Sequence, residues 1–153
     1  MSICTLIAAD VPLPAVAPPK AYPLAINLDH GTISDGGADD NYWLFPFADV
    51  EDYSEKQYGV SLEWQLTEGR ARRLIAYIHD VLQKTDVVEI WRVWLMSCCE
   101  FEDRPVIFKK YISAQDLTAE HIKELEDAVI WNSPDKSYPN RPSFYCLCIT
   151  REP

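Results

Sequence analysis

The sequence predicts one α+β domain, spanning residues 1–153, in which two or three helices pack on a largely antiparallel sheet. The chain has 153 residues, of which 48% are hydrophobic, and this is the size and content of a single domain with its own core. Several short segments alternate apolar and polar residues with the period of a strand, and others have helical spacing. Because the expected connections between strands are more often hairpins than crossovers, we expect mainly antiparallel pairing.

The first part of the chain is predicted to combine short strands with irregular segments. Residues 3–9 are apolar and form the first predicted strand, because the run is short and lacks the preceding basic residues of a secretory signal. Residues 11–23 contain five prolines and form a Pro-rich irregular arm. We expect this arm to lie as a strap over the domain surface, and docking into a proline-binding groove is the alternative. Residues 24–28 suit a short strand, 29–32 a turn, and 34–41 a loop rich in Gly and Asp.

An aromatic segment follows, and then a predicted short helix. Residues 42–47 are apolar, but Pro46 has no N–H to donate within a sheet, so we expect an edge strand or a buried loop. Residues 49–57 are predicted to form a short helix that ends at Gly59.

The middle of the chain has the clearest periodic patterns. Residues 60–66 alternate apolar and polar side chains, as in a strand with one buried face. Thr67 suits the N-cap of a helix whose apolar spacing continues to about Lys84. Residues 87–96 are apolar on both alternating faces, which is typical of a central strand covered on both sides.

The C-terminal part is predicted to contain two strands around a helix. Residues 105–112 form a strand after an acidic turn, and we expect them to pair with residues 87–96 as a long hairpin. A helix then begins at Asp116 or Thr118, with Ile122 and Leu125 facing inward. A loop over 132–142 leads to the last predicted strand, 143–150.

An excess of carboxylates limits the classes of partner. The 24 Asp and Glu residues against 14 Lys and Arg give a formal net charge of −10 and a pI near 4.6. This charge disfavours binding to nucleic acid and to anionic lipid, whereas it attracts a basic protein. A purely solubilising role is the alternative. No apolar run approaches the roughly 20 residues that span a bilayer, so we expect no membrane partner and a cytoplasmic location.

The cysteine pattern favours free thiols. Their number is odd, and a chain of this length does not need disulfides, so a reducing compartment fits best. Cys146 and Cys148 share one face of a predicted strand, and Cys98 with Cys99 would complete a four-thiolate zinc site. Adjacent cysteines of a strand point to opposite faces, however, so we expect these thiols, with Cys4, to remain unligated. The sequence therefore predicts neither a metal site nor a cofactor.

Strong catalytic motifs are absent from the sequence. It contains no phosphate-binding glycine loop, no nucleophile elbow and no paired metal-binding histidines on one helix. A thiol-dependent enzyme would need Cys98 or Cys99 to meet His30 or His121 in space. The acidic segment 100–103 lies beside these thiols and does not favour the thiolate. No catalytic residue is predicted.

Carboxylates and aromatic rings together predict a partner-binding surface. One acidic cluster lies in the loop 34–41 and another in the turn 100–104, and solvated loops without a partner are the alternative. Aromatic side chains nearby are suited to anchor an interface whose charges attract a basic partner. The predicted partner-binding residues are Asp35, Asp39, Asp40, Tyr42, Trp43, Glu51, Asp52, Glu100, Glu102, Asp103 and Tyr138.

These features favour a non-enzymatic binding protein that engages a basic protein partner. In its size, its charge and its lack of catalytic motifs, the chain resembles small acidic bacterial immunity proteins, which neutralise a toxin by covering its active site. The resemblance implies an immunity or inhibitor role and carries over no individual residue. The alternatives are a small thiol-dependent enzyme or hydrolase, and a structural subunit that forms a homodimer through an aromatic sheet edge.

Overall fold

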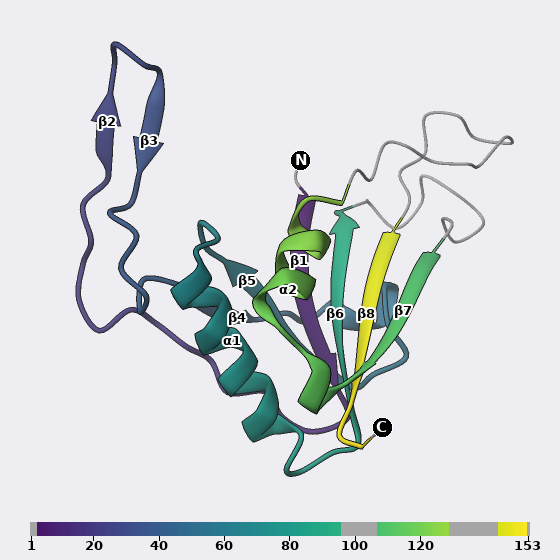
Figure 1. Ribbon diagram of the computed structural model, residues 1–153. Helices are drawn as coiled ribbons and strands as arrows, with labels where there is room; N and C mark the ends of the chain where they lie inside the picture. Colours follow the sequence, from purple (N-terminus) through teal and green to yellow (C-terminus); the bar gives the residue numbers. More distant parts are fainter. Residues whose placement is uncertain (1–2, 96–106, 129–143, 153) are drawn as a thin grey trace, which may run out of the picture.

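Six strands form the main sheet of the computed structural model, which describes residues 3–95, 107–128 and 144–152 (Figure 1). In sheet order they are β4 (Trp43–Pro46), β5 (Tyr58–Glu63), β1 (Ile3–Ala9), β6 (Val87–Trp94), β8 (Phe144–Thr150) and β7 (Ile107–Ser113). Neighbouring strands are antiparallel except β7 and β8. The helices α1 (Glu68–Val81) and α2 (Ala119–Glu126) pack on one face of the sheet. The predicted α+β class is therefore confirmed.

The position of β8 differs from the prediction. This strand lies between β6 and β7, so the long hairpin predicted from 87–96 and 105–112 is wrong. Burial explains the order: β8 is buried along most of its length, which suits a strand with a neighbour on each side, whereas residues 108–111 of β7 are exposed and suit an edge. The 3₁₀ helix η2 (Ala114–Asp116) and α2 follow β7 in the chain, as expected for a connection between parallel strands.

The larger part of the core lies between the helices and the sheet. Thr67 caps α1 as predicted, because its Oγ1 accepts a hydrogen bond from the Arg70 backbone N–H at 3.1 Å. The predicted N-cap Thr118 precedes α2, whose Ile122 and Leu125 are buried. Other core residues on this side are Ile7, Leu44, Val60, Leu74, Ile78, Val88, Ile90 and Ile149.

The opposite face of the sheet is covered by residues 47–57, which contain the 3₁₀ helix η1 (Val50–Asp52). This helix is shorter than predicted. Gly59 does not end it but lies within β5, where a Cβ would lie 2.8 Å from the Val50 side chain. The glycine therefore allows residues 47–57 to approach the sheet closely, and β6 is covered on both faces as predicted.

The Pro-rich arm 11–23 lies over the domain surface, as predicted. Val16 and Leu44 exchange backbone hydrogen bonds of 3.1 and 2.9 Å, so the arm protects the edge strand β4. The Tyr77 hydroxyl donates to the Pro14 carbonyl at 2.7 Å, and Val11 and Leu13 pack against the core. These contacts hold the arm against the domain as far as Val16.

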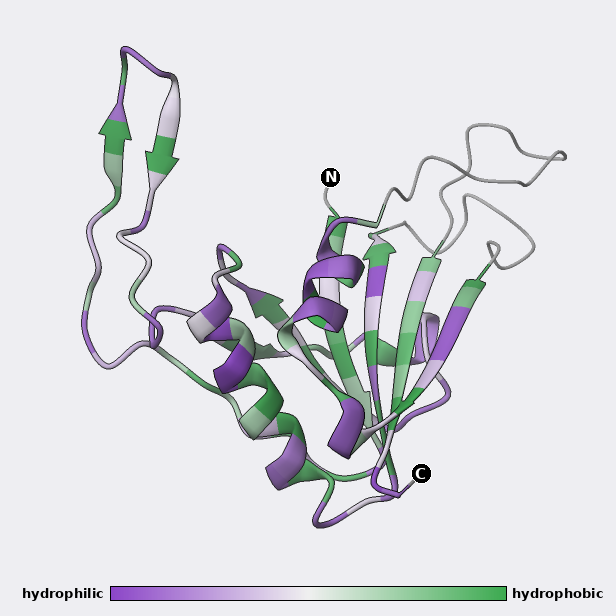
Figure 2. Ribbon diagram, viewed as in Figure 1, coloured by the Kyte–Doolittle hydropathy of each residue, from purple (hydrophilic) through white to green (hydrophobic). Residues whose placement is uncertain are grey.

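A separate two-stranded sheet stands away from the body of the protein (Figure 1). It consists of β2 (Ala25–Asn27) and β3 (Thr32–Ser34), and we call residues 24–34 the projecting hairpin. The predicted strand and turn are confirmed, and β3 is a strand that the sequence patterns did not indicate. Figure 2 shows hydrophobic residues on this hairpin at a distance from the core.

Candidate functional site

The projecting hairpin has an apolar face that is exposed to solvent. Leu24 precedes β2, Ile26 lies within it and Leu28 begins the turn, while Ile33 on β3 is the cross-strand partner of Ile26 and shares its face. Their exposed fractions are 61%, 64%, 89% and 58%. Burial of such side chains is the usual source of hairpin stability, and an isolated two-stranded hairpin is marginal in water. An exposed set of this kind indicates an interaction surface.

The tip of the hairpin closes in a defined turn. The Asn27 side-chain oxygen accepts hydrogen bonds from the backbone N–H groups of Asp29 and His30 at 3.1 and 3.2 Å. Gly31 has a φ of 62°, a value that other residues rarely adopt. The carboxylate of Asp29 and the imidazole of His30 are both exposed at this tip.

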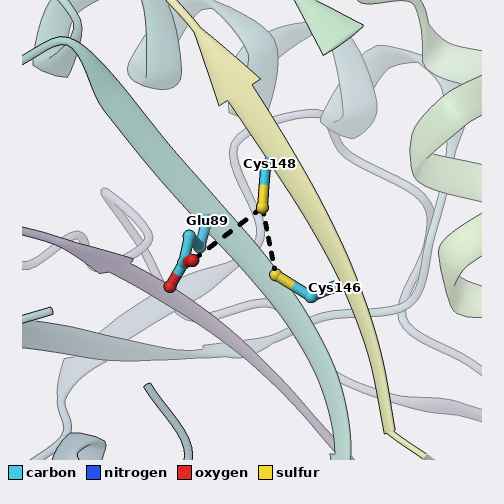
Figure 3. A group of neighbouring side chains, drawn as sticks. All are labelled: Glu89, Cys146 and Cys148. Carbon is cyan, nitrogen blue, oxygen red and sulfur yellow. Dashed lines mark hydrogen bonds between the residues drawn. The ribbon is translucent and has the colours of Figure 1, made fainter. Parts of the chain in front are cut away.

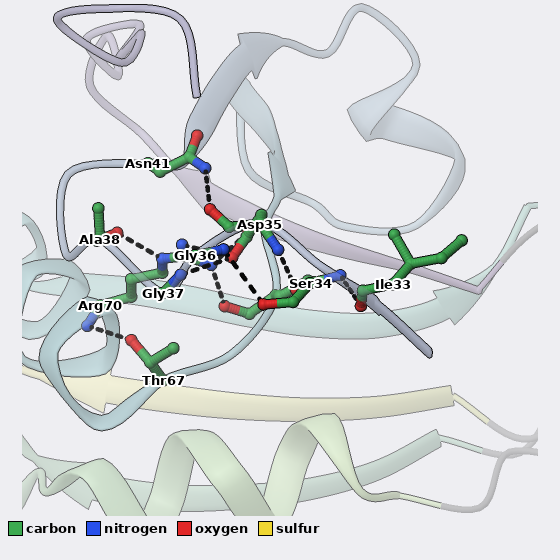
Figure 4. Close-up of polar contacts among 10 residues, drawn as sticks. Ile33, Ser34, Asp35, Gly36, Gly37, Ala38, Asn41, Thr67 and Arg70 are labelled. Carbon is green, nitrogen blue, oxygen red and sulfur yellow. Dashed lines mark hydrogen bonds and ion pairs between the residues drawn. The ribbon is translucent and has the colours of Figure 1, made fainter. Parts of the chain in front are cut away.

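Arg70 holds the base of the hairpin against α1 (Figure 4). Its guanidinium is completely buried and donates to both carboxylate oxygens of Asp35, at 2.7 and 2.9 Å. It also donates to the carbonyl oxygens of Ala38, at 2.8 Å, and Gln65, at 2.6 Å. The same residue thus ties the hairpin base to the start of α1 and to the segment between β5 and α1.

The loop beyond the hairpin is shaped around Asp35. Gly36 and Gly37 have φ values of 81° and 70°, and the Gly37 N–H donates to an Asp35 carboxylate oxygen at 3.0 Å. The Asn41 amide donates to the Asp35 carbonyl at 3.4 Å. The hydrogen bonds from Arg70 lower the pKa of the Asp35 carboxyl, and the Gly37 N–H acts in the same direction. Asp35 is therefore a charged anchor of the hairpin.

The other predicted residues near this loop lie in different environments. Asp39 is exposed and lies against the first turn of α1, where a Cβ on Gly69 would come within 1.9 Å of its Oδ1. Asp40 accepts a hydrogen bond from the Tyr22 hydroxyl, which raises the pKa of that tyrosine. Tyr42 is buried in the core, whereas Trp43 is exposed and stacks on Phe45, with ring centroids 5.2 Å apart.

The predicted binding residues do not all meet on one surface. Asp35, Asp39 and Asp40 gather at the base of the projecting hairpin, whereas Glu51 and Asp52 are exposed on η1, on the face of the sheet opposite the helices. Four predicted binding residues lie outside the described residues, and so do two of the cysteines. These six are Glu100, Glu102, Asp103, Tyr138, Cys98 and Cys99.

A second polar cluster is buried beneath η1 and combines Glu89 with Cys146 and Cys148 (Figure 3). The two sulfurs are 3.6 Å apart, and Cys148 Sγ donates to Glu89 Oε2 at 3.8 Å. Glu89 Oε1 accepts hydrogen bonds from Ser54 Oγ, at 2.5 Å, and Trp91 Nε1, at 3.1 Å. The hydrogen bond between the sulfurs raises the pKa of Cys146 and lowers that of Cys148.

His121 and Cys146 line a common pocket, but no described histidine is hydrogen-bonded to a described thiol. His121 Nδ1 accepts a hydrogen bond from the Thr118 backbone N–H at 3.0 Å, and His30 lies at the hairpin tip. Among residues 3–95, 107–128 and 144–152, no cysteine is hydrogen-bonded to a histidine. The described residues thus add no thiol–imidazole pair to support the enzyme alternative.

Two residues of these candidate sites, Arg70 and Glu89, were not among the predicted site residues. Arg70 is one of several basic residues near the start of α1, and nothing in the local pattern distinguishes it. Glu89 did carry a signal, because it is the only carboxylate within the apolar run 87–96. A charged group at the centre of a strand that is covered on both faces needs a polar partner.

In comparisons with known proteins, no family model, no curated protein and no solved structure matches this chain. None of the helices in the described residues has the length and apolar character needed to cross a bilayer.

Proposed function

We propose that this chain is a non-enzymatic binding protein that engages a basic protein partner through the projecting hairpin. The observation that carries the proposal is the exposure of four apolar side chains, Leu24, Ile26, Leu28 and Ile33, on a hairpin whose base is held by Arg70. An immunity or inhibitor role, in which the partner is a toxin, is the most concrete version of this proposal.

The apolar face supplies the main driving force of binding. Full burial of one such aliphatic side chain contributes about 1.5–3 kcal/mol, so four of them form a useful central anchor for an interface. Association itself costs about 4–15 kcal/mol, because the two proteins lose translational and rotational freedom, and the ordering of a mobile loop would add to this cost. The hydrogen bonds of Arg70 and Asp35 reduce that second cost, because they orient the hairpin before the partner arrives.

Charge selects the kind of partner. The net charge of −10 attracts a basic protein and raises the encounter rate. Asp29 is exposed at the hairpin tip and Asp39 at its base, so carboxylates flank the apolar face at both ends. Binding is therefore expected to weaken as salt is added.

A homodimer is the second candidate, and the same hairpin favours it. Two copies that packed their apolar faces together would bury all four aliphatic side chains of each chain. The like charges of Asp29 and Asp39 oppose this arrangement, which is why a basic partner is preferred. Light scattering on the purified protein distinguishes a dimer from a monomer.

The test is capture from a native extract at low and high salt, with partners identified by mass spectrometry. The tagged wild type is compared with a variant that combines Leu24→Ser, Ile26→Ser, Leu28→Ser and Ile33→Ser. Ala25→Ser, on the opposite face of β2, is the matched control. We expect one basic protein to be retained by the wild type and the control, and to be lost from the variant and at high salt. Equal retention by the variant would overturn the proposal.

A further inference from the structure

We propose that Glu89, Cys146 and Cys148 form a zinc-binding site, which is independent of the projecting hairpin and of the proposed partner. Each residue offers one ligand atom, and the three atoms lie within 4.8 Å of one another. Figure 3 shows the three side chains directed toward one another, and all three are buried on the face of the sheet that residues 47–57 cover.

The backbone places these ligand atoms together. Cys146 and Cys148 are two residues apart on β8 and therefore share a face, and Glu89 on β6 is the cross-strand partner of Cys148. Two thiolates bound tetrahedrally to zinc, with Zn–S bonds of about 2.3 Å, lie about 3.8 Å apart. The observed separation of 3.6 Å is close to this value, so the sulfurs need little movement to bind the ion.

The carboxyl group of Glu89 is oriented as a metal ligand would be. Its Oε1 already accepts hydrogen bonds from Ser54 and Trp91, which leaves Oε2 directed toward Cys148. Metal-bound carboxylates are typically held in this way by outer partners that fix their orientation. The hydrogen bonds of Ser54 and Trp91 thus prepare one oxygen for the ion.

A bound divalent cation would also offset the cost of burying the polar groups of this cluster. Thiols are weak hydrogen-bond donors, so Cys148 compensates poorly for the burial of the Glu89 carboxyl. A bound cation would stabilise the carboxylate and both thiolates directly. Lys109 lies nearby, with its Nζ 5.8 Å from the centre of the Trp91 ring, and can balance the remaining negative charge.

The donor set selects the metal. Thiolate ligands exclude Mg²⁺ and Ca²⁺, which require oxygen ligands, whereas Zn²⁺ accepts sulfur and carboxylate oxygen together. With three protein ligands, the fourth position of a tetrahedral ion is open to water or another small ligand.

The test uses Co²⁺ as a spectroscopic probe on the full chain, reduced and treated with a chelator. We expect one equivalent to bind with a thiolate-to-cobalt charge-transfer band, and Zn²⁺ to displace it and to raise the melting temperature. Cys146→Ser and Cys148→Ser should lose the band. Cys98→Ser with Cys99→Ser, and Cys4→Ser, are the control variants and should retain it.

A milder variant keeps the test informative if the cysteine variants fail to fold. Ser54→Ala removes a hydrogen bond to Glu89 without removing a ligand, and such changes weaken metal affinity by about 10–100-fold. The charge-transfer band should persist in this variant, with a higher dissociation constant. Absence of the band in the wild type, its loss from the Cys98/Cys99 variant, or unchanged affinity in Ser54→Ala would each overturn the proposal.

Discussion

The contact between Arg70 and Asp35 shows how one buried residue fixes the direction of a whole element. A buried guanidinium is costly unless its donors are paired, and here Arg70 donates to a carboxylate and to two backbone carbonyls. An apolar residue at position 70 would avoid that cost, but it would leave the base of the hairpin without a directional contact. The ion pair therefore provides orientation more than net stability.

Removing Asp35 is expected to destabilise the protein. Asp35→Ala leaves the Arg70 charge buried without its partner, and such changes cost about 3–5 kcal/mol. Asp29→Ala removes an equal charge from the exposed hairpin tip and should change the free energy of unfolding by no more than about 0.5 kcal/mol. Urea unfolding of both variants measures the difference. Similar values for the two would contradict the anchoring role.

The sequence predicted some individual residues correctly because their roles are local. Thr67 was predicted as an N-cap from the helical pattern that follows it, and Ile122 and Leu125 from their spacing. Asp35 was predicted as a binding residue, yet its partner Arg70 lies 35 residues further along the chain. Only the fold brings the two together, so no local pattern could assign the anchoring role.

The projecting hairpin differs from the other elements in what its apolar residues do. Elsewhere they stabilise the fold by packing, as Ile78 does on α1, whereas Ile26 is exposed on β2. The hairpin should therefore contribute little to global stability, and its apolar face remains available for a partner.

Substitutions at Ile78 and Ile26 distinguish an isoleucine that packs in the core from one that is exposed on the hairpin. Ile78→Ala creates a cavity in the core and should lower the free energy of unfolding by about 2–5 kcal/mol. Ile26→Ala removes an exposed side chain and should change it by about 0.5 kcal/mol or less. Thermal or urea unfolding provides both values. A large loss for Ile26→Ala would mean that the hairpin face is packed, and would contradict its assignment as a free surface.

Element type was predictable from the sequence, but strand partners were less so. Apolar runs identified β1 and β6, and periodicity identified β5 and both helices, because it reports which face is buried. It does not report which strand lies beside which. Residues 87–96 and 105–112 were expected to pair because they are consecutive, but the more fully buried β8 occupies the place between them.

At the scale of the whole molecule, the two candidate sites are separated. The projecting hairpin extends outward from the body (Figure 1), whereas the Glu89–Cys146–Cys148 cluster is buried on the face of the sheet that residues 47–57 cover. A partner at the hairpin and an ion in the cluster would therefore act independently. The net charge of −10 adds long-range attraction for a basic partner.

Site-specific cross-linking shows whether the projecting hairpin contacts the proposed partner. A photoreactive amino acid is placed at Leu28, which is 89% exposed, or at Tyr111 on β7, which is 70% exposed, and each protein is irradiated in a native extract. We expect an adduct with a basic protein from position 28 and none from position 111. Adducts with the same protein from position 111 alone, or equally from both, would contradict it.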